Sequence, residues 1–159
     1  MIVRMLAPFA ALATLAAGPV DKMATFDGYA LGMTVAQAEG VSPNRKAFDC
    51  GRLMTSRCIV YERRLGTLVG VVTIEFSLDD RRIDRIEIAP RGVGQGGASC
   101  ETAWHGLVDL LSETFGTPQS REGNTVRWRM DAVAVTATVL QQQGEFCDVA
   151  AALTSIGPS

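Results

Sequence analysis

The longest amphipathic pattern in the chain lies between Ser99 and Pro118. Ser99 fits the N-cap position, where its hydroxyl accepts a hydrogen bond from a free N–H of the first turn. Gly116 and Pro118 end the pattern, because glycine takes the left-handed cap conformation and proline cannot continue a helix. The segment therefore predicts one long helix with a single buried face. Apolar residues recur along it at spacings of three and four: Ala103, Trp104, Leu107, Val108, Leu111 and Phe115.

Most of the remaining chain shows the period of β-strands. In residues 68–78, for example, Val72, Ile74 and Phe76 alternate with more polar neighbours. Asp79 and Asp80 then favour a turn, which joins residues 68–78 and 82–89 as an antiparallel hairpin. A turn at residues 141–145 joins the last two strands in the same way. The predicted strands are residues 26–31, 58–64, 68–78, 82–89, 125–130, 133–140 and 146–154.

The order of these elements predicts the fold class. Thr34 is the expected N-cap of a short helix, and the succession of one helix and three strands then occurs twice, roughly over residues 34–89 and 99–154. We therefore expect an α+β fold made of two tandem helix-plus-three-antiparallel-strand units. These units form one sheet with helices packed on one face and solvent on the other. Residues 24–156 are expected to be a single domain.

The first residues have the pattern of an export signal. Arg4 supplies a positive charge, a run of about 13 apolar and small residues follows, and Ala16, Ala17 and Gly18 offer small-residue cleavage sites. The run is shorter than the ~20 residues that a membrane-spanning helix needs. Residues 1–18 are therefore predicted to be a signal peptide. The mature protein is expected in the periplasm or outside the cell, without a stable membrane anchor.

Four cysteines follow the predicted cleavage point, and an even number in an exported chain is typical of disulfides. Three pairings are open. We favour Cys50 with Cys58, which are close in sequence, and Cys100 with Cys147, which ties the start of the long helix to a late strand. A zinc site is the alternative, but the chain has no Cys-x-x-Cys pair and one histidine.

Charge and motifs exclude several classes of function. With 15 basic and 17 acidic residues the formal charge is −2, which does not support nucleic-acid binding. Gly92, Gly94 and Gly97 match G-x-G-x-x-G, the dinucleotide-binding fingerprint. The preceding strand is predicted to belong to an antiparallel hairpin, however, and the following strand alternates in polarity, unlike a buried parallel strand. We expect a linker here and no cofactor.

One set of residues imitates a catalytic triad. His105, Asp109 and Ser112 are spaced at about one turn on the polar face of the long helix. A solvated helix face has no cleft and no oxyanion hole, so an ordinary polar surface is the preferred interpretation. A small exported hydrolase that uses His105 remains an alternative function. A binder of a small apolar ligand between helix and sheet is another.

The polar face of the predicted sheet offers the best candidate binding surface. If Trp128 faces the helices, its neighbours Arg127 and Arg129 point to solvent, where two arginines can engage an acidic partner surface. Polar residues of neighbouring strands join them on this face: Thr73, Glu75, Thr136 and Thr138.

Two short motifs carry a family resemblance. Leu31-Gly32-Met33-Thr34 with Ala38, and Phe115-Gly116-Thr117-Pro118 with Trp128, resemble the signature of small envelope proteins typified by BamE (SmpA). The two halves of that signature are adjacent in the family and far apart here, and the family's lipidated cysteine is missing. The resemblance implies the fold shared with β-lactamase inhibitor proteins, which are not enzymes and bind other proteins. We therefore expect a non-enzymatic, protein-binding module of the bacterial cell envelope whose partner is another envelope protein.

Overall fold

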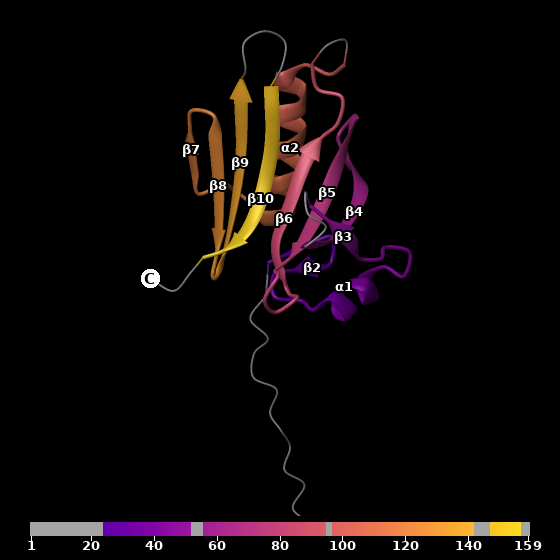
Figure 1. Ribbon diagram of the computed structural model, residues 1–159. Helices are drawn as coiled ribbons and strands as arrows, with labels where there is room; N and C mark the ends of the chain where they lie inside the picture. Colours follow the sequence, from indigo (N-terminus) through magenta and orange to yellow (C-terminus); the bar gives the residue numbers. More distant parts are fainter. Residues whose placement is uncertain (1–23, 52–55, 95–96, 142–146, 157–159) are drawn as a thin grey trace, which may run out of the picture.

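The computed structural model describes residues 24–51, 56–94, 97–141 and 147–156. Eight antiparallel strands form one sheet in the spatial order β3-β4-β5-β6-β10-β9-β8-β7 (Figure 1). The strands are β3 (Phe48–Cys50), β4 (Ser56–Leu65), β5 (Leu68–Phe76), β6 (Ile83–Pro90), β7 (Ser120–Glu122), β8 (Thr125–Met130), β9 (Val133–Gln141) and β10 (Cys147–Ser155). Outside this sheet are the small hairpin of β1 (Thr25–Phe26) and β2 (Tyr29–Ala30) and the helices α1 (Val35–Val41) and α2 (Cys100–Phe115). The predicted signal peptide and most of the predicted turn at 141–145 lie outside the described residues.

The predicted α+β fold of two helix-plus-three-strand units is wrong. Strands make up 53% of the structure and helices 19%, so the protein is mostly β. The short strands β3 and β7 extend the sheet at its two edges, and α1 is only seven residues long. Neither β3 nor β7 is long enough to show an alternating pattern, because each has three residues that are mostly exposed. The sheet is therefore wider, and the helical part smaller, than the sequence pattern predicts.

Six of the seven predicted strands are confirmed, with ends that differ by one or two residues. The exception is the strand expected at residues 26–31. There the chain turns back on itself at Asp27 and Gly28, which have φ angles of 50° and 87°. Positive φ is easily adopted by glycine and tolerated by aspartate. The segment is therefore the hairpin β1–β2 rather than an edge strand.

Helix α2 has the predicted caps. Ser99 Oγ accepts a hydrogen bond from the N–H of Thr102 at 3.1 Å, and Gly116, with φ 83°, donates its N–H to the carbonyl of Ser112. The helix lies on one face of the sheet (Figure 1). A β-carbon at Gly106 would lie 3.0 Å from the carbonyl oxygen of Leu65, so glycine at this position lets α2 approach the end of β4 closely.

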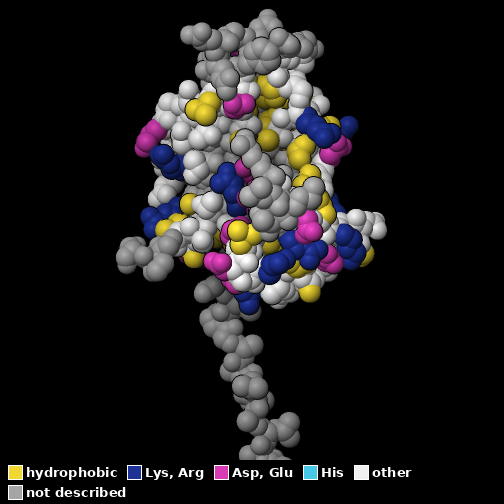
Figure 2. Space-filling model, viewed as in Figure 1, with side chains coloured by type: hydrophobic (Ala, Val, Ile, Leu, Met, Phe, Trp, Pro, Cys, Tyr) yellow, Lys and Arg dark blue, Asp and Glu magenta, His cyan; other side chains and the backbone are white. Residues whose placement is uncertain are grey.

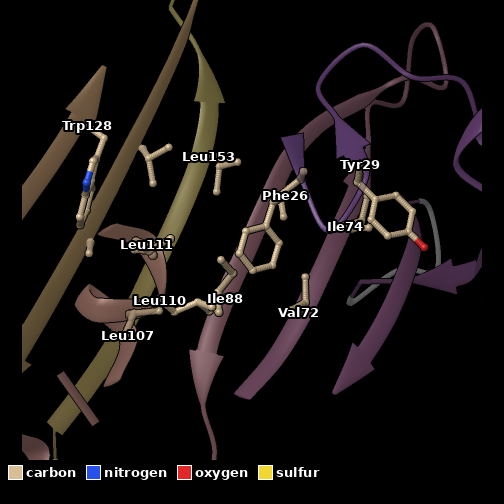
Figure 3. Close-up of a cluster of buried hydrophobic side chains, with 14 of the residues drawn as sticks. Phe26, Tyr29, Val72, Ile74, Ile88, Leu107, Leu110, Leu111, Trp128 and Leu153 are labelled. Carbon is tan, nitrogen blue, oxygen red and sulfur yellow. The ribbon is translucent and has the colours of Figure 1, made fainter. Parts of the chain in front are cut away.

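The hydrophobic core fills the space between α2 and the sheet (Figure 3). Leu107 and Leu111 of α2 and Trp128 of β8 are among its fully buried side chains. The indole N–H of Trp128 donates to the carbonyl of Gly116 at 2.9 Å. This bond satisfies the one polar atom of a buried indole and fixes the C-terminal end of α2 against β8. The ring of Phe26, from the β1–β2 hairpin, lies 6.4 Å from that of Phe115.

Both favoured disulfides are present. Cys50 and Cys58 join the edge strand β3 to β4, and Cys100 and Cys147 join the first residue of α2 to the first residue of β10. The described part of the chain contains no free cysteine.

The two halves of the sheet meet at a short seam, which we define as the pairing of β6 with β10. It comprises only four residue pairs, from Ile88–Ala151 to Arg85–Thr154. Pro90 explains why it stops. The N–H of Arg91 donates to the carbonyl of Val69 in β5, so the preceding residue, Pro90, is the one oriented toward β10. Proline has no N–H to donate, and the ladder ends there.

Candidate binding surface on the open sheet face

The six residues predicted for binding all lie on the sheet face opposite α2. Val72 and Ile74 of β5 are buried, so Thr73 and Glu75 between and beside them point the other way. The same alternation places Arg127 and Arg129 of β8 on this face, beside the buried Trp128. Thr136 and Thr138 of β9 follow the same rule around the buried Ala137. We call this surface the open face.

The register divides the six residues into two groups. Arg127 lies directly opposite Thr136, and Thr138 lies opposite Thr125, so the β8 and β9 residues are neighbours. Thr73 and Glu75 lie in β5, which is separated from β9 by β6 and β10. One continuous row nevertheless crosses the sheet between the two groups, and it consists of Thr73, Glu87, Ala152, Thr136 and Arg127.

The two arginines of this surface are in different electrostatic settings. Arg127 Nη1 makes a salt bridge of 3.1 Å to Glu122 of β7. Arg129 is exposed and forms no ion pair with the described residues. Because an exposed salt bridge contributes little, both guanidinium groups remain accessible to an acidic partner.

Several charged residues of the open face are absent from the six predicted for binding, and two of them lie in the middle of the sheet. Arg85 and Glu87 lie in β6, and their side chains form a salt bridge with an Nη2–Oε2 distance of 2.8 Å. Arg85 forms a basic cluster in the sequence with Arg81 and Arg82, and such clusters are typical of the edge strand of a sheet. β6 nevertheless lies in the middle of the sheet. The signal that could have found both residues is their alternation with the buried Ile86 and Ile88.

Glu75 faces Arg85 across the β5–β6 ladder, but that guanidinium is bound to Glu87. Partial burial raises the pKa of Glu75 above its usual value. Arg85 opposes this shift, while the carboxylates of Glu87 and Asp84 add to it. The β5–β6 side of the open face therefore contains a carboxyl group that is easier to protonate than an ordinary glutamate.

The centre of the open face has small side chains. Small side chains of the central strands, all partly exposed, lie between the charged residues of β5–β6 and those of β8; they are Ala89, Ala134, Ala150, Ala152 and Thr154. In the coloured part of this side in Figure 2, basic and acidic side chains are interspersed. The small side chains allow close approach of another protein, and a cavity of about 420 Å³ lies beside them, with Glu87, Ala89 and Ala150 in its lining.

The triad-like residues of α2 have no catalytic geometry. The side chain of His105 is 65% exposed, and its Nε2 lies 3.8 Å from Glu101, on the side away from the next helical turn. Asp109 is exposed as well. No group of three or more His, Cys, Asp or Glu residues that could hold a metal ion occurs in the part of the chain that the structure describes.

The glycine loop is closed by its own backbone. Ala98 N–H donates to the carbonyl of Gly92, and Gly94 N–H donates to the carbonyl of Ala98, both at 3.0 Å. A β-carbon at Gly97 would collide with the carbonyl oxygen of Gly92. The glycines therefore allow a compact turn before α2, and the N–H of Gly94, which a phosphate would need, is already bonded.

The interior offers little room for the alternative of an apolar ligand between α2 and the sheet, because Leu107, Leu111 and Trp128 fill it. A cavity of about 500 Å³ lies at one end of the sheet instead, lined by the β5–β6 turn together with Leu31 and Val133. None of the helices in the described ranges is both long and apolar enough to cross a lipid bilayer.

Comparison with protein-family models, curated proteins and solved structures finds no match for this chain. The described residues form a disulfide-linked, mostly β domain in which a helix covers one face of the sheet and none of their helices covers the other. The resemblance to BamE-like proteins and β-lactamase inhibitor proteins stays a prediction from the sequence.

Proposed function

We propose that this protein is a non-enzymatic, exported binding module that recognises another protein of the cell envelope through the open face. The observation that carries the proposal is the sheet itself. One face of its eight strands lies under α2. No helix of the described chain covers the other face, which has partly exposed small residues at its centre. A broad sheet surface with arginines at one side is typical of protein recognition rather than of catalysis.

The two disulfides are consistent with an oxidising, extracytoplasmic location, since such bonds are rare in reducing cytosol. The periplasm, reached through the predicted signal peptide, is the specific location that we propose. The partner would then be an envelope protein that meets the domain after export.

Charge complementarity suggests how the partner is oriented. Arg127 and Arg129 favour acidic side chains over β8 and β9, while Glu75 and Glu87 on the β5–β6 side favour basic ones. The small residues between them accept apolar or aromatic side chains that need close approach.

The experiment is photo-crosslinking in periplasmic extract, combined with affinity recovery. A photoreactive amino acid at Thr136 is expected to crosslink the partner, and the same residue at His105 on α2 is the matched control. Recovery of that crosslinked partner should fall in an R127A/R129A variant but not in a variant with Glu101→Gln, an exposed residue of α2. Equal recovery with the R127A/R129A variant, or equal crosslinking from both sites, would remove the open face as the binding surface.

A further inference from the structure

A second surface of the molecule, the outer edge of β4, has backbone groups that can pair with an additional strand. β3 pairs with only three of the ten β4 residues, Ser56 to Cys58. No other strand of the described chain pairs with the outer edge beyond that point, and Figure 1 shows no element beside the upper part of β4. We call residues 60–65 the free edge.

The direction of the backbone groups follows from one hydrogen bond. The carbonyl of Val69 accepts from the N–H of Arg91, so Val69 is oriented toward β6 and away from β4. Its register partner in β4, Arg64, must then point its own N–H and C=O away from β5, toward the outside. Orientation alternates along a strand, so Glu62 and Val60 also point outward. The free edge thus presents three N–H and three C=O groups.

The opposite edge of the sheet is more fully covered. β7 pairs with Thr125 to Arg127 of β8, and the N–H of Gln119 donates to the carbonyl of Arg127. By the same alternation, Arg129 is the only remaining residue of β8 whose backbone groups point outward from that edge. The free edge of β4 is therefore the longer template for strand addition.

Side chains near the free edge also indicate what kind of segment would bind. On the open face, Val60 is 43% exposed, and Arg64 is exposed without an ion pair among the described residues. Glu62 is already bound to Arg91 at 2.6 Å. An added segment would therefore gain most from an acidic residue opposite Arg64 and an apolar residue opposite Val60.

On the other side of the free edge is a cavity. It has a volume of about 320 Å³ and lies between the β4–β5 hairpin and α2, with walls formed by Arg63, Arg64, Gly66, Gly106, Asp109, Leu110 and Glu113. Asp109 and Glu113 are one helical turn apart and make no ion pair with described residues. Leu65 points to this side of the sheet, so the residue of an added strand opposite Leu65 would direct its side chain toward α2. A lysine there can lay its apolar stem on Leu110 and place its ammonium group near the two carboxylates.

We propose that the free edge binds an extended segment of another polypeptide as a ninth, antiparallel strand. The segment carries a basic residue that enters the cavity beside α2 and an acidic residue opposite Arg64. Main-chain hydrogen bonds supply the affinity, and the two charged side chains set the register. The free edge borders the open face but lies at the opposite end of the sheet from Arg127 and Arg129, so binding at either place can fail without the other.

The probe is the blocked hexapeptide acetyl-Lys-Glu-Thr-Thr-Thr-Val-amide, followed by amide chemical shifts of the isotope-labelled protein. Its residues are intended to lie opposite Leu65 through Val60 in that order. The expected result is a saturable change in the amides of β4, β5 and the nearby turn of α2. A control peptide that begins Glu-Lys instead of Lys-Glu is expected to bind more weakly. Its glutamate would lie near Asp109 and Glu113, and its lysine would lie opposite Arg64.

Backbone methylation of the peptide separates strand addition from simple charge attraction. An N-methyl group on the fourth residue removes the N–H that points at Glu62 and should weaken binding at least about tenfold. An N-methyl group on the fifth residue, whose N–H points away from β4, should leave binding nearly unchanged. Because the protein is the same in both titrations, loss of folding cannot explain a difference.

Protein variants locate the contact. Arg64→Gln and an Asp109→Asn/Glu113→Gln pair are each expected to weaken binding roughly two- to fivefold, as for exposed charge pairs. Arg121→Gln, in β7 at the far edge of the sheet, is the matched control and should bind like the parent. Equal binding of the two methylated peptides, shifts centred on β8 and β9, or no saturable shift up to the solubility limit of the peptide would each overturn the proposal. The crosslinking experiment on the open face would be unaffected by any of these outcomes.

Discussion

Removal of the two disulfides one at a time should destabilise the protein by unequal amounts. Cys100 and Cys147 are 47 residues apart, whereas Cys50 and Cys58 are only 8 apart. In the chain-entropy model, a crosslink stabilises the fold by restricting the unfolded chain, and the effect grows with the logarithm of the loop length. The long loop then contributes about 4 kcal/mol and the short loop about 2.5 kcal/mol at 25 °C.

The measurement compares two double variants, Cys100→Ala/Cys147→Ala and Cys50→Ala/Cys58→Ala, by urea denaturation under non-reducing conditions. The expected difference in free energy of unfolding between them is about 1.5 kcal/mol, with the long-loop variant less stable. Its m-value should also rise more, because a longer segment of the unfolded chain is released to solvent.

A packing explanation predicts the opposite order. Cys58 is only 4% exposed, so its truncation removes buried surface, whereas Cys100 and Cys147 are partly exposed. If the short-loop variant is the less stable of the two, the loss of buried contacts outweighs the loop entropy, and the reasoning from loop length is refuted.

Three further predictions concern single side chains. Trp128→Phe should lower the free energy of unfolding by about 1–2 kcal/mol, measured by urea denaturation, because it leaves the carbonyl of Gly116 without its donor; an unchanged midpoint would show that this bond contributes nothing. Burial, together with the neighbouring charge of Asp27, raises the pKa of Tyr61 far above its usual value of 10.0. Stability should therefore fall as pH rises above about 10, because the tyrosine then ionises in the unfolded chain but not in the folded protein. Tyr61→Phe should flatten this pH dependence in thermal unfolding, and an equal slope in both proteins would contradict the assignment. Because the pKa of Glu75 is raised in the folded protein, its ionisation costs stability as pH rises through the folded pKa. The Glu75→Gln variant should therefore be more stable than the parent at pH 7, and the difference should shrink toward pH 4. A constant difference across that range would argue against the raised pKa.

Much of the fold follows from simple patterns in the sequence. The period of 3.6 residues and the capping residues locate α2 to within one residue, since Ser99 and Gly116 have the chemistry that helix ends require. Strict alternation locates both ends of β8 and places β5 to within two residues, because one face of each strand is buried and the other is not. These elements are long enough for the pattern to repeat.

The parts that the sequence did not predict are short or depend on distant residues. β3 has three residues, and its Phe48 is 49% exposed, so neither length nor burial marks it as a strand. The β1–β2 hairpin had a local signal in the Asp27-Gly28 dipeptide, a common hairpin turn, but it lies inside an apolar run that favours one strand. The central position of Arg85 depends on the pairing of β6 with β10, about 65 residues later in the chain, which no local pattern encodes.

The candidate binding surface, like the fold, could be predicted from the sequence only in part. Alternation alone assigns Arg127, Arg129 and the threonines to the open face, and the structure places them there. It does not reveal that Arg127 already has a partner in Glu122, or that Arg85 is bound to Glu87, because those pairs depend on strand register and rotamer.

The four-pair seam between β6 and β10 has a consequence for how the chain folds. On each side of it, consecutive strands are close in sequence and paired with each other, so β4–β5–β6 and β8–β9–β10 are meanders of mostly local contacts. The two meanders pair with each other only at the seam, and this pairing closes a long loop of chain. Closing that loop costs conformational entropy, which slows the formation of non-local pairs. Each meander can therefore be expected to exchange its amide hydrogens as a separate cooperative unit, with the amides of Ile86 and Ile88 reporting the docking of one unit on the other. The Cys100–Cys147 bond holds the chain near the two meanders together before they pair. Formation of this disulfide should therefore speed folding as well as stabilise the folded protein.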